Sequence, residues 1–135
     1  MKTHLFPVVR KLAGPTSLMF ALQFLPIVPA MAQDPVKVDS RHYKVEFENS
    51  QVRVLRIKYG PHEKSVMHEH PAAVAVFLTD VNGKFTMSDG KTVPMDVKAG
   101  TAQWNAGGKH LPENLGDTPF ELILVELKGK HHPAK

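Results

Sequence analysis

Three histidines have the residue type and the spacing of a metal site. His68 and His70 are one residue apart at the start of an apolar run, SVMHEHPAAVAVFLTD. Alternate side chains of a β-strand point to the same face, so these two imidazoles would share a face about two residue rises apart. His110, in GTAQWNAGGKHLPEN, is the best candidate for a third ligand. Imidazole nitrogens bind divalent transition metals, and the pattern predicts a site for iron, manganese, nickel or zinc.

The sequence around these histidines predicts strands that would position them. In residues 43–48 the apolar Tyr43, Val45 and Phe47 alternate with charged side chains, which predicts a half-buried strand with these three residues on its inner face. The next strand, 52–59, changes phase at Leu55, which indicates a bulge. The segment AAVAVFLT, from Ala72, is apolar at both parities and predicts a central strand covered on two sides.

The second half of the chain continues the β pattern. A hairpin is predicted about Asp89-Gly90, and Pro94 favours an outer position for its second strand. FELILVELK, from Phe120, predicts another nearly two-sided apolar strand. No window beyond the first thirty or so residues has a helical stripe, and 135 residues suffice for one domain. We therefore predict an all-β domain over residues 43–128, with an N-terminal extension at 33–42 and a polar tail at 129–135.

Residues 1–32 have the pattern of a secretory signal peptide. Lys2, Arg10 and Lys11 form a basic start, the 22 residues of 12–33 carry no charge, and Ala30-Met31-Ala32 is typical of a cleavage site. The alternative is an uncleaved membrane anchor, which the prolines of this segment disfavour. We expect a mature protein that begins at Gln33, is exported to the periplasm or secreted, and has no stable membrane anchor after cleavage.

Charge and cysteine content limit the classes of function. The pI is about 9.4, but the predicted signal holds three of the 17 basic residues and none of the 13 acidic ones. The remaining chain is almost neutral, and we exclude nucleic acid as a partner. The absence of cysteine excludes disulfides, thiolate ligands, a cysteine nucleophile and a lipid-modified cysteine.

Two motifs resemble those of the cupins. The first cupin motif is a glycine, a spacer, His-x-His, a glutamate three or four residues later and a further glycine; it is matched here by Gly60, His68, His70 and Gly83. The second contains Pro-x-Gly-x-x-His-x-x-x-Asn after a glycine, and it is matched by Gly100, Gly107, His110 and Asn114, with Asn105 in place of the proline. The resemblance covers Tyr43 to Lys128.

The resemblance implies a double-stranded β-helix, or jelly-roll, barrel with His68, His70 and His110 pointing into its interior. The motif glutamate would fall at Val74 or Ala75, neither of which can bind a metal. Val74 is expected to be in phase with the two neighbouring histidines. The predicted site is therefore three histidines with open positions for water or substrate.

Other residues near the motifs are assigned weaker roles. His62 is expected at the surface, Glu69 should face away from its two flanking histidines, and Glu113 is expected to be solvated. Gln103 and Trp104 could line the mouth of a pocket, although core packing is the stronger interpretation for Trp104. His131 and His132 lie in the polar tail and would chelate a metal only loosely.

Two classes of function follow from these observations. The first is an exported metalloprotein that activates a small molecule, with dioxygenase chemistry implied by the resemblance to three-histidine cupin dioxygenases. The alternative is a non-catalytic module that binds a metal or a small ligand, because no acid or base can be placed beside the histidines. A barrel that has lost its metal is a third, weaker hypothesis. Exposed barrel edges are compatible with a homodimer.

Overall fold

The computed structural model describes residues 33–129, which form nine strands and one short helix. The helix is α1 (Pro35–Val38). The strands are β1 (Tyr43–Glu48), β2 (Val52–Tyr59), β3 (His68–His70), β4 (Ala73–Phe77), β5 (Val81–Met87), β6 (Thr92–Val97), β7 (Ala102–Asn105), β8 (Gly108–Asn114) and β9 (Phe120–Leu127).

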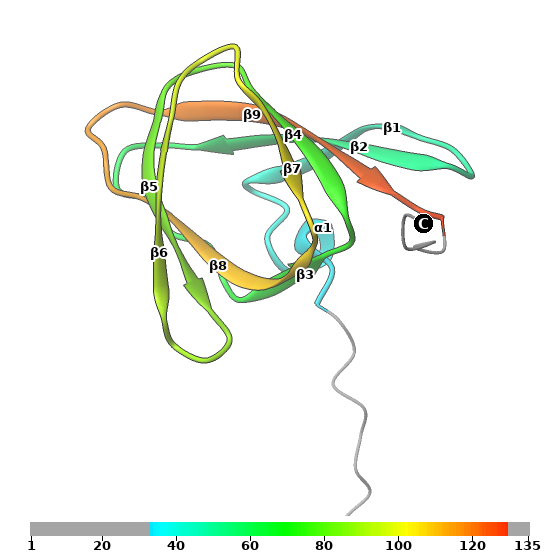
Figure 1. Ribbon diagram of the computed structural model, residues 1–135, viewed down its shortest axis with the longest axis horizontal. Helices are drawn as coiled ribbons and strands as arrows, with labels where there is room; N and C mark the ends of the chain where they lie inside the picture. Colours follow the sequence, from blue (N-terminus) through cyan, green and yellow to red (C-terminus); the bar gives the residue numbers. More distant parts are fainter. Residues whose placement is uncertain (1–32, 130–135) are drawn as a thin grey trace, which may run out of the picture.

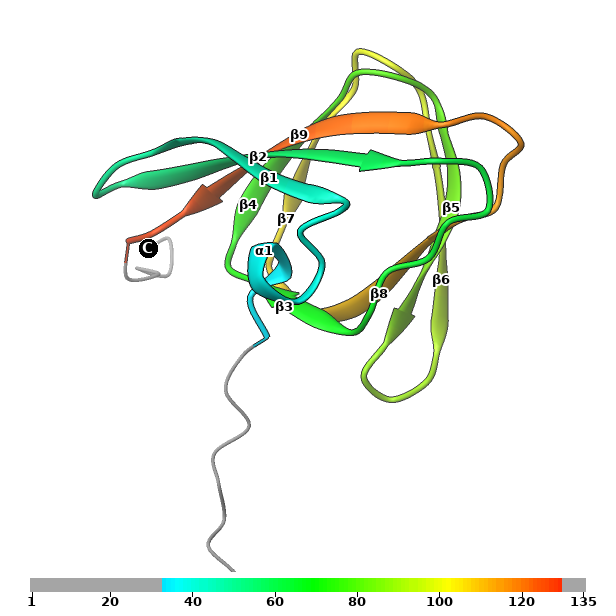
Figure 2. The ribbon, with the colours of Figure 1, turned by 180° about the vertical axis from the view of Figure 1, so that it is seen from behind.

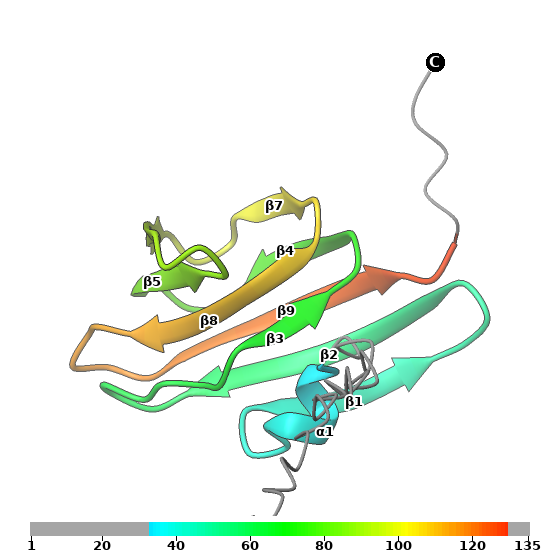
Figure 3. The ribbon, with the colours of Figure 1, turned by 90° about the horizontal axis from the view of Figure 1, so that it is seen from below.

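The strands form two antiparallel sheets that curve around a common interior. The five-stranded sheet has the order β1-β2-β9-β4-β7, and the four-stranded sheet has the order β3-β8-β5-β6. Figure 1 looks into the resulting barrel, with β9 and β4 on one side and β8 and β5 on the other. The chain crosses between the sheets after β2, β3, β4, β6, β7 and β8, as in a jelly roll (Figure 3).

The interior is built by alternate residues of long, regular strands. β2 and β9 pair over eight consecutive residues, and their inward positions carry Tyr59, Ile57 and Leu55 opposite a row that begins at Phe120. These side chains are buried and pack with those of β4, β5 and β6. Each large apolar side chain that is fully buried contributes about 1.5–3 kcal/mol, so this face fixes the register of both strands.

The N-terminal extension is tied to the barrel. The Asp34 carboxylate caps α1 by accepting from the backbone N–H of Val36 at 2.9 Å, and Pro35 begins the helix. α1 packs against β1 and β3, as Figure 2 shows from behind. No helix within residues 33–129 is long and apolar enough to cross a membrane.

The predicted strands are all present, with two differences in the first hairpin. The bulge lies where the β2 sequence changes phase, but the extra residue is Glu46 of β1, because Val45 pairs with Leu55 and Phe47 with Val54. β2 itself continues without irregularity along β9. The predicted inner face of β1 is also wrong: Val45 and Phe47 are 42% and 53% exposed, because β1 is an edge strand that extends past the opposite sheet.

The remaining strand predictions are confirmed in position. β5 and β6 form the predicted hairpin about Asp89-Gly90, and β6, which carries Pro94, is an edge strand. β4 is an inner strand between β9 and β7, but only Ala73, Ala75 and Phe77 are fully buried. The predicted signal peptide of residues 1–32, together with His131 and His132, lies outside the described residues.

Candidate metal centre

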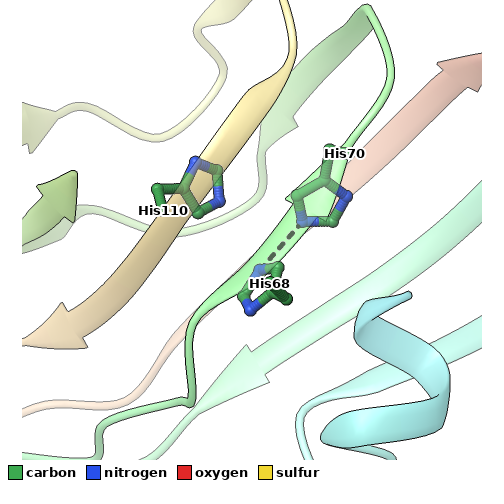
Figure 4. A group of neighbouring side chains, drawn as sticks. All are labelled: His68, His70 and His110. Carbon is green, nitrogen blue, oxygen red and sulfur yellow. Dashed lines mark hydrogen bonds between the residues drawn. The ribbon is translucent and has the colours of Figure 1, made fainter. Parts of the chain in front are cut away.

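The structure brings the three predicted histidines together on one wall of the barrel. His68 and His70 come from β3, and His110 comes from the neighbouring strand β8, directly opposite His68 in the ladder. One ring nitrogen of each residue lies within 4.8 Å of one nitrogen of the other two, and all three side chains are buried. Figure 4 shows the rings gathered on the same side of both strands.

Two other motif residues build the loops that hold these strands. Gly107 has a φ of +86°, and a Cβ there would lie 2.7 Å from the carbonyl oxygen of His70. Only glycine fits this close approach between the start of β8 and the end of β3. Asn114 is buried and donates its amide to the carbonyl oxygens of Gly60, at 2.8 Å, and Thr118, at 2.9 Å. These residues therefore position the site without entering it.

Hydrogen bonds on the outer nitrogens fix the tautomers of His68 and His70. His68 Nδ1 lies 2.8 Å from the carbonyl oxygen of Val66, which can only accept, so this nitrogen carries the proton. His70 Nδ1 lies 2.6 Å from Glu126 Oε1 and donates to that carboxylate. Both rings consequently direct Nε2 toward the interior, and in a neutral ring of this tautomer that atom carries the lone pair.

The two Nε2 atoms face each other at 3.1 Å, as the dashed line in Figure 4 marks. In the neutral form neither ring has a proton to place between these two atoms, so a proton or a metal cation between them would stabilise the contact. Two nitrogens that bind one ion at about 2.0–2.1 Å lie about 2.9–3.4 Å apart for N–metal–N angles of about 90–109°. The separation and the neutral imidazole donor set both fit a divalent transition metal.

A pair of buried phenols completes the wall beside His68. The Tyr43 hydroxyl lies 3.0 Å from His68 Nε2 and 2.8 Å from the Tyr59 hydroxyl. Because His68 Nε2 is an acceptor, Tyr43 donates to it and Tyr59 donates to Tyr43. Burial raises the pKa of Tyr43 well above its usual value, so its phenol stays neutral. Tyr43 thus occupies in the metal-free protein the lone pair that a metal would use.

A buried chain of charges supports His70 from behind. Glu126, 1% exposed, accepts from Arg53 Nε at 2.5 Å as well as from His70, and Arg53 Nη1 donates to Asp34 at 2.7 Å. Burial opposes ionisation of Glu126, but the hydrogen bonds from His70 and Arg53 outweigh it and lower the pKa of the carboxyl. The N-terminal extension therefore reaches the candidate site through Asp34, Arg53 and Glu126.

His68 and His110 are held neutral by their surroundings. Burial, followed by the proximity of His70, lowers the pKa of His68 to about 4. Burial and the two other histidines lower the pKa of His110 to about 3. The His110 ring stacks on Phe85, with the ring centroids 4.4 Å apart and the planes at 19°. Neutral imidazoles have free lone pairs, which is the form that binds a metal.

A cavity of about 490 Å³ extends from His70 and His110 into the barrel. Gln103 and Trp104 line it, as one of the two interpretations of these residues predicted. The preferred interpretation of Trp104 as a core residue is wrong, because its side chain is 57% exposed on the edge strand β7. Trp104 marks the mouth of the cavity.

The structure places the other candidates outside the cluster. His62 is exposed and lies 2.8 Å from Asp117, Glu113 pairs with Lys84 at 3.2 Å, and Glu69 faces Lys109. The predicted alignment of Val74 with His68 and His70 is wrong. Pro71 and Ala72 separate β3 from β4. As a result the Ala75 side chain lines the cavity, whereas the Val74 side chain points to the opposite face of β4.

Sequence reasoning missed the roles of Tyr43, Arg53 and Glu126. Tyr43 was recognised only as a strand residue. A usable signal existed for the other two: Glu126 follows Phe120, Leu122 and Leu124 at the inward parity of β9, and its partner in the β2 ladder is Arg53. Opposite charges at paired inward positions predict a buried ion pair.

No known family model matches the sequence, and no curated protein matches it significantly. Solved structures do match its fold. A cupin domain from Bordetella pertussis superposes with a TM-score of 0.60 at 24% identity, covering 64% of this chain and 92% of the other. A protein with a double-stranded β-helix domain from Klebsiella pneumoniae gives a TM-score of 0.53 at 21% identity, covering 65% and 76%.

A third match is an RmlC-like cupin family protein with a double-stranded β-helix fold from Methanocaldococcus jannaschii. Its TM-score is 0.50 at 18% identity, and the match covers 66% of this chain and 83% of the other. The predicted jelly-roll barrel is thereby confirmed. The chain therefore has the double-stranded β-helix fold that these cupin domains share.

Proposed function

We propose that this chain is an exported cupin metalloprotein that holds one divalent transition metal with His68, His70 and His110 and presents it to a small molecule. The observation that carries the proposal is the contact of two Nε2 lone pairs at 3.1 Å, each fixed by a partner on Nδ1. A buried arrangement of this kind is stabilised by a cation between the rings.

Each protein group has a definite task in this proposal. When bound, iron, manganese, nickel or zinc would supply Lewis acidity, and iron or manganese would add redox chemistry. The Val66 carbonyl and the Glu126 carboxylate orient His68 and His70, while Phe85 shields one face of His110. The cavity beside His70 and His110 receives the small molecule.

The activity that fits this arrangement is oxidation of the small molecule by dioxygen, as the resemblance to three-histidine cupin dioxygenases implies. The alternative is a non-catalytic module that binds a ligand or a metal. One observation favours it: the described residues that line the cavity include no serine, lysine or glutamate to act as an acid or base beside the histidines. Any catalysis would then depend on the metal and on the neutral Tyr43.

Export and self-association belong to the same proposal. The basic start, the uncharged stretch and Ala30-Met31-Ala32 support removal of residues 1–32 and a location in the periplasm or outside the cell. Exposed Val45 and Phe47 on the edge strand β1 support a homodimer formed through that edge.

Metal analysis of the protein purified from its native compartment tests the proposal. We expect a single transition-metal ion per chain, and loss of most of it in His68→Ala, His70→Ala and His110→Ala. His62→Ala is the matched control, because His62 is exposed, lies beside Asp117 and is not one of the three clustered histidines. A protein that contains no metal and takes up none, or a His110→Ala variant that retains all of it, would contradict the proposal. Dioxygen uptake by the iron- or manganese-loaded protein, with small molecules extracted from its compartment, separates the enzyme from the binding module.

A further inference from the structure

The cavity beside the candidate metal centre carries the uncharged amides of Gln103 and Asn105 along β7, and most of its other polar groups are concentrated at the histidine end. There the imidazoles of His70 and His110 and the hydroxyl-bearing rings of Tyr43 and Tyr59 line it. The remainder of the wall is dominated by aromatic, aliphatic and thioether side chains, among them Phe77, Phe85, Met87, Met95, Leu122 and Trp104. A ligand that fills this space meets imidazoles and phenols at one end, and apolar side chains with two uncharged amides along the rest of the wall.

The described residues that line the cavity include no lysine or arginine. Asp96 is the acidic residue among them, but it lies between the buried Met95 and Val97 on β6 and is exposed, so its carboxylate points out of the barrel. A negative charge on a ligand would find a counter-charge only at the metal. A second negative charge, away from the histidines, would be desolvated without a partner.

An aromatic ring lines the inner end of the apolar wall, and a second borders the mouth from the outer face of β7, where Trp104 pairs with Val74. Phe85 stacks on His110 at the inner end, and Trp104, 57% exposed, lies at the mouth. Met87 and Met95 add polarizable sulfur atoms, which contact aromatic rings favourably. A volume of about 490 Å³ lies within the range of cavities that enclose drug-sized molecules.

We propose that the cavity selects a ligand with one oxygen-bearing head group, directed at His70, His110 and Tyr43, and an uncharged body that contains an aromatic ring. This inference rests on the proposed function for the head group, which binds at the metal. The selection against a charged body rests on the apolar wall alone. Dicarboxylates and phosphorylated compounds are excluded by the same wall.

Fluorescence of Trp104, the one tryptophan in the chain, reports binding at the mouth directly. The probes are 3-phenylpropanoate and 3-(4-carboxyphenyl)propanoate, which share the head group and ring and differ by a second carboxylate. They are titrated into the zinc-loaded and the metal-free protein, after calorimetry has measured zinc binding. We expect the zinc-loaded protein to bind the monocarboxylate at least about tenfold more tightly, since burial of an unpaired carboxylate is costly.

A charge introduced into the wall provides the matched test. Val93 lines the cavity and is 46% exposed, whereas Val45 is 42% exposed on β1 and does not line it. Val93→Lys should reduce the preference for the monocarboxylate by about tenfold, because the ammonium pairs with the second carboxylate. Val45→Lys should leave the preference unchanged.

The outcomes separate this inference from the proposed function. A protein that binds no zinc contradicts the proposed function. The titration of the metal-free protein then still tests whether the apolar wall selects against the second carboxylate. If the protein binds zinc, three results would overturn the proposed ligand class. These are equal affinity for the two probes, no affinity for either probe, and an equal change of the preference in Val93→Lys and Val45→Lys.

Discussion

Replacing Glu126 with glutamine should weaken metal binding without unfolding the protein. Glutamine has nearly the same size, but His70 Nδ1 and Arg53 Nε donate to different oxygens of Glu126, and the single amide oxygen of glutamine can replace only one of them. The charge is lost as well, so one of the two charge-assisted hydrogen bonds becomes a neutral-acceptor bond, the other is lost, and Arg53 keeps only Asp34 as an anionic partner. The imidazole of His70 becomes a less basic ligand with a less firmly fixed orientation.

The expected magnitudes follow from these contacts. Hydrogen bonds to charged groups contribute about 1.5–3 kcal/mol and neutral ones about 0.5–1.5 kcal/mol, so the Glu126→Gln variant should lose about 2–3 kcal/mol of unfolding free energy. Changes to groups that orient metal ligands typically reduce affinity by about 10–100-fold, and we expect zinc affinity to fall within that range. Chemical denaturation and calorimetric zinc titration measure the two effects.

Glu121→Gln is the matched control on the same strand. Glu121 accepts from Arg56 and Lys58, but it stands at the outward parity of β9 and its side chain is 24% exposed. Its loss should cost less than about 1 kcal/mol and leave zinc affinity unchanged. Unchanged zinc affinity in a folded Glu126→Gln protein, or an equal loss in Glu121→Gln, would refute the role assigned to Glu126.

Three further changes test other contacts of the site. Tyr43→Phe removes the hydroxyl that competes for His68 Nε2, so calorimetry should show zinc binding tightened by up to about fivefold; a loss of tenfold or more would show that the phenol itself helps to hold the metal. In the metal-free protein, His68 and His110 have pKa values of about 4 and about 3, below the value of about 6.5 in the unfolded chain, so the unfolded state binds more protons as the pH falls below about 6.5. The unfolding free energy should therefore fall between pH 7 and pH 5, by up to about 1.4 kcal/mol per pH unit for each histidine, and a flat profile by chemical denaturation would contradict this. Gly107→Ala should lower the unfolding free energy more than Gly90→Ala in the same assay. Both glycines have positive φ, but only at Gly107 would the added Cβ lie 2.7 Å from the His70 carbonyl oxygen. Equal losses of unfolding free energy would mean that the loop moves aside freely.

The sequence predicted the fold and the three histidines because both depend on short-range patterns. Alternation along single strands and the two motif spacings are properties of contiguous residues. The positions of Val45 and Val74 were wrong for a different reason. The exposure of Val45 depends on how far the opposite sheet extends, and the direction of Val74 depends on the break at Pro71 and Ala72, which resets the parity between β3 and β4.

The groups that support the histidines are set by pairing between distant strands. Tyr43 and His68 are 25 residues apart, and His70 and Glu126 are 56 apart. Their contacts depend on the register of β2 against β9 and on the closure of the barrel, which no local pattern encodes. The burial of Glu126 was still accessible from sequence, since its inward position follows from the parity of a single strand, at which it continues the series of Phe120, Leu122 and Leu124.

X-ray absorption at the zinc edge tests the central claim most directly. In protein loaded with one zinc ion per chain, we predict three imidazole nitrogens at about 2.0–2.1 Å, with the remaining positions filled by oxygen. In His110→Gln the imidazole count should fall to two, whereas His62→Gln should leave it at three. A zinc spectrum with oxygen ligands alone, or one that His110→Gln does not change, would contradict the assignment of His68, His70 and His110 as a metal centre.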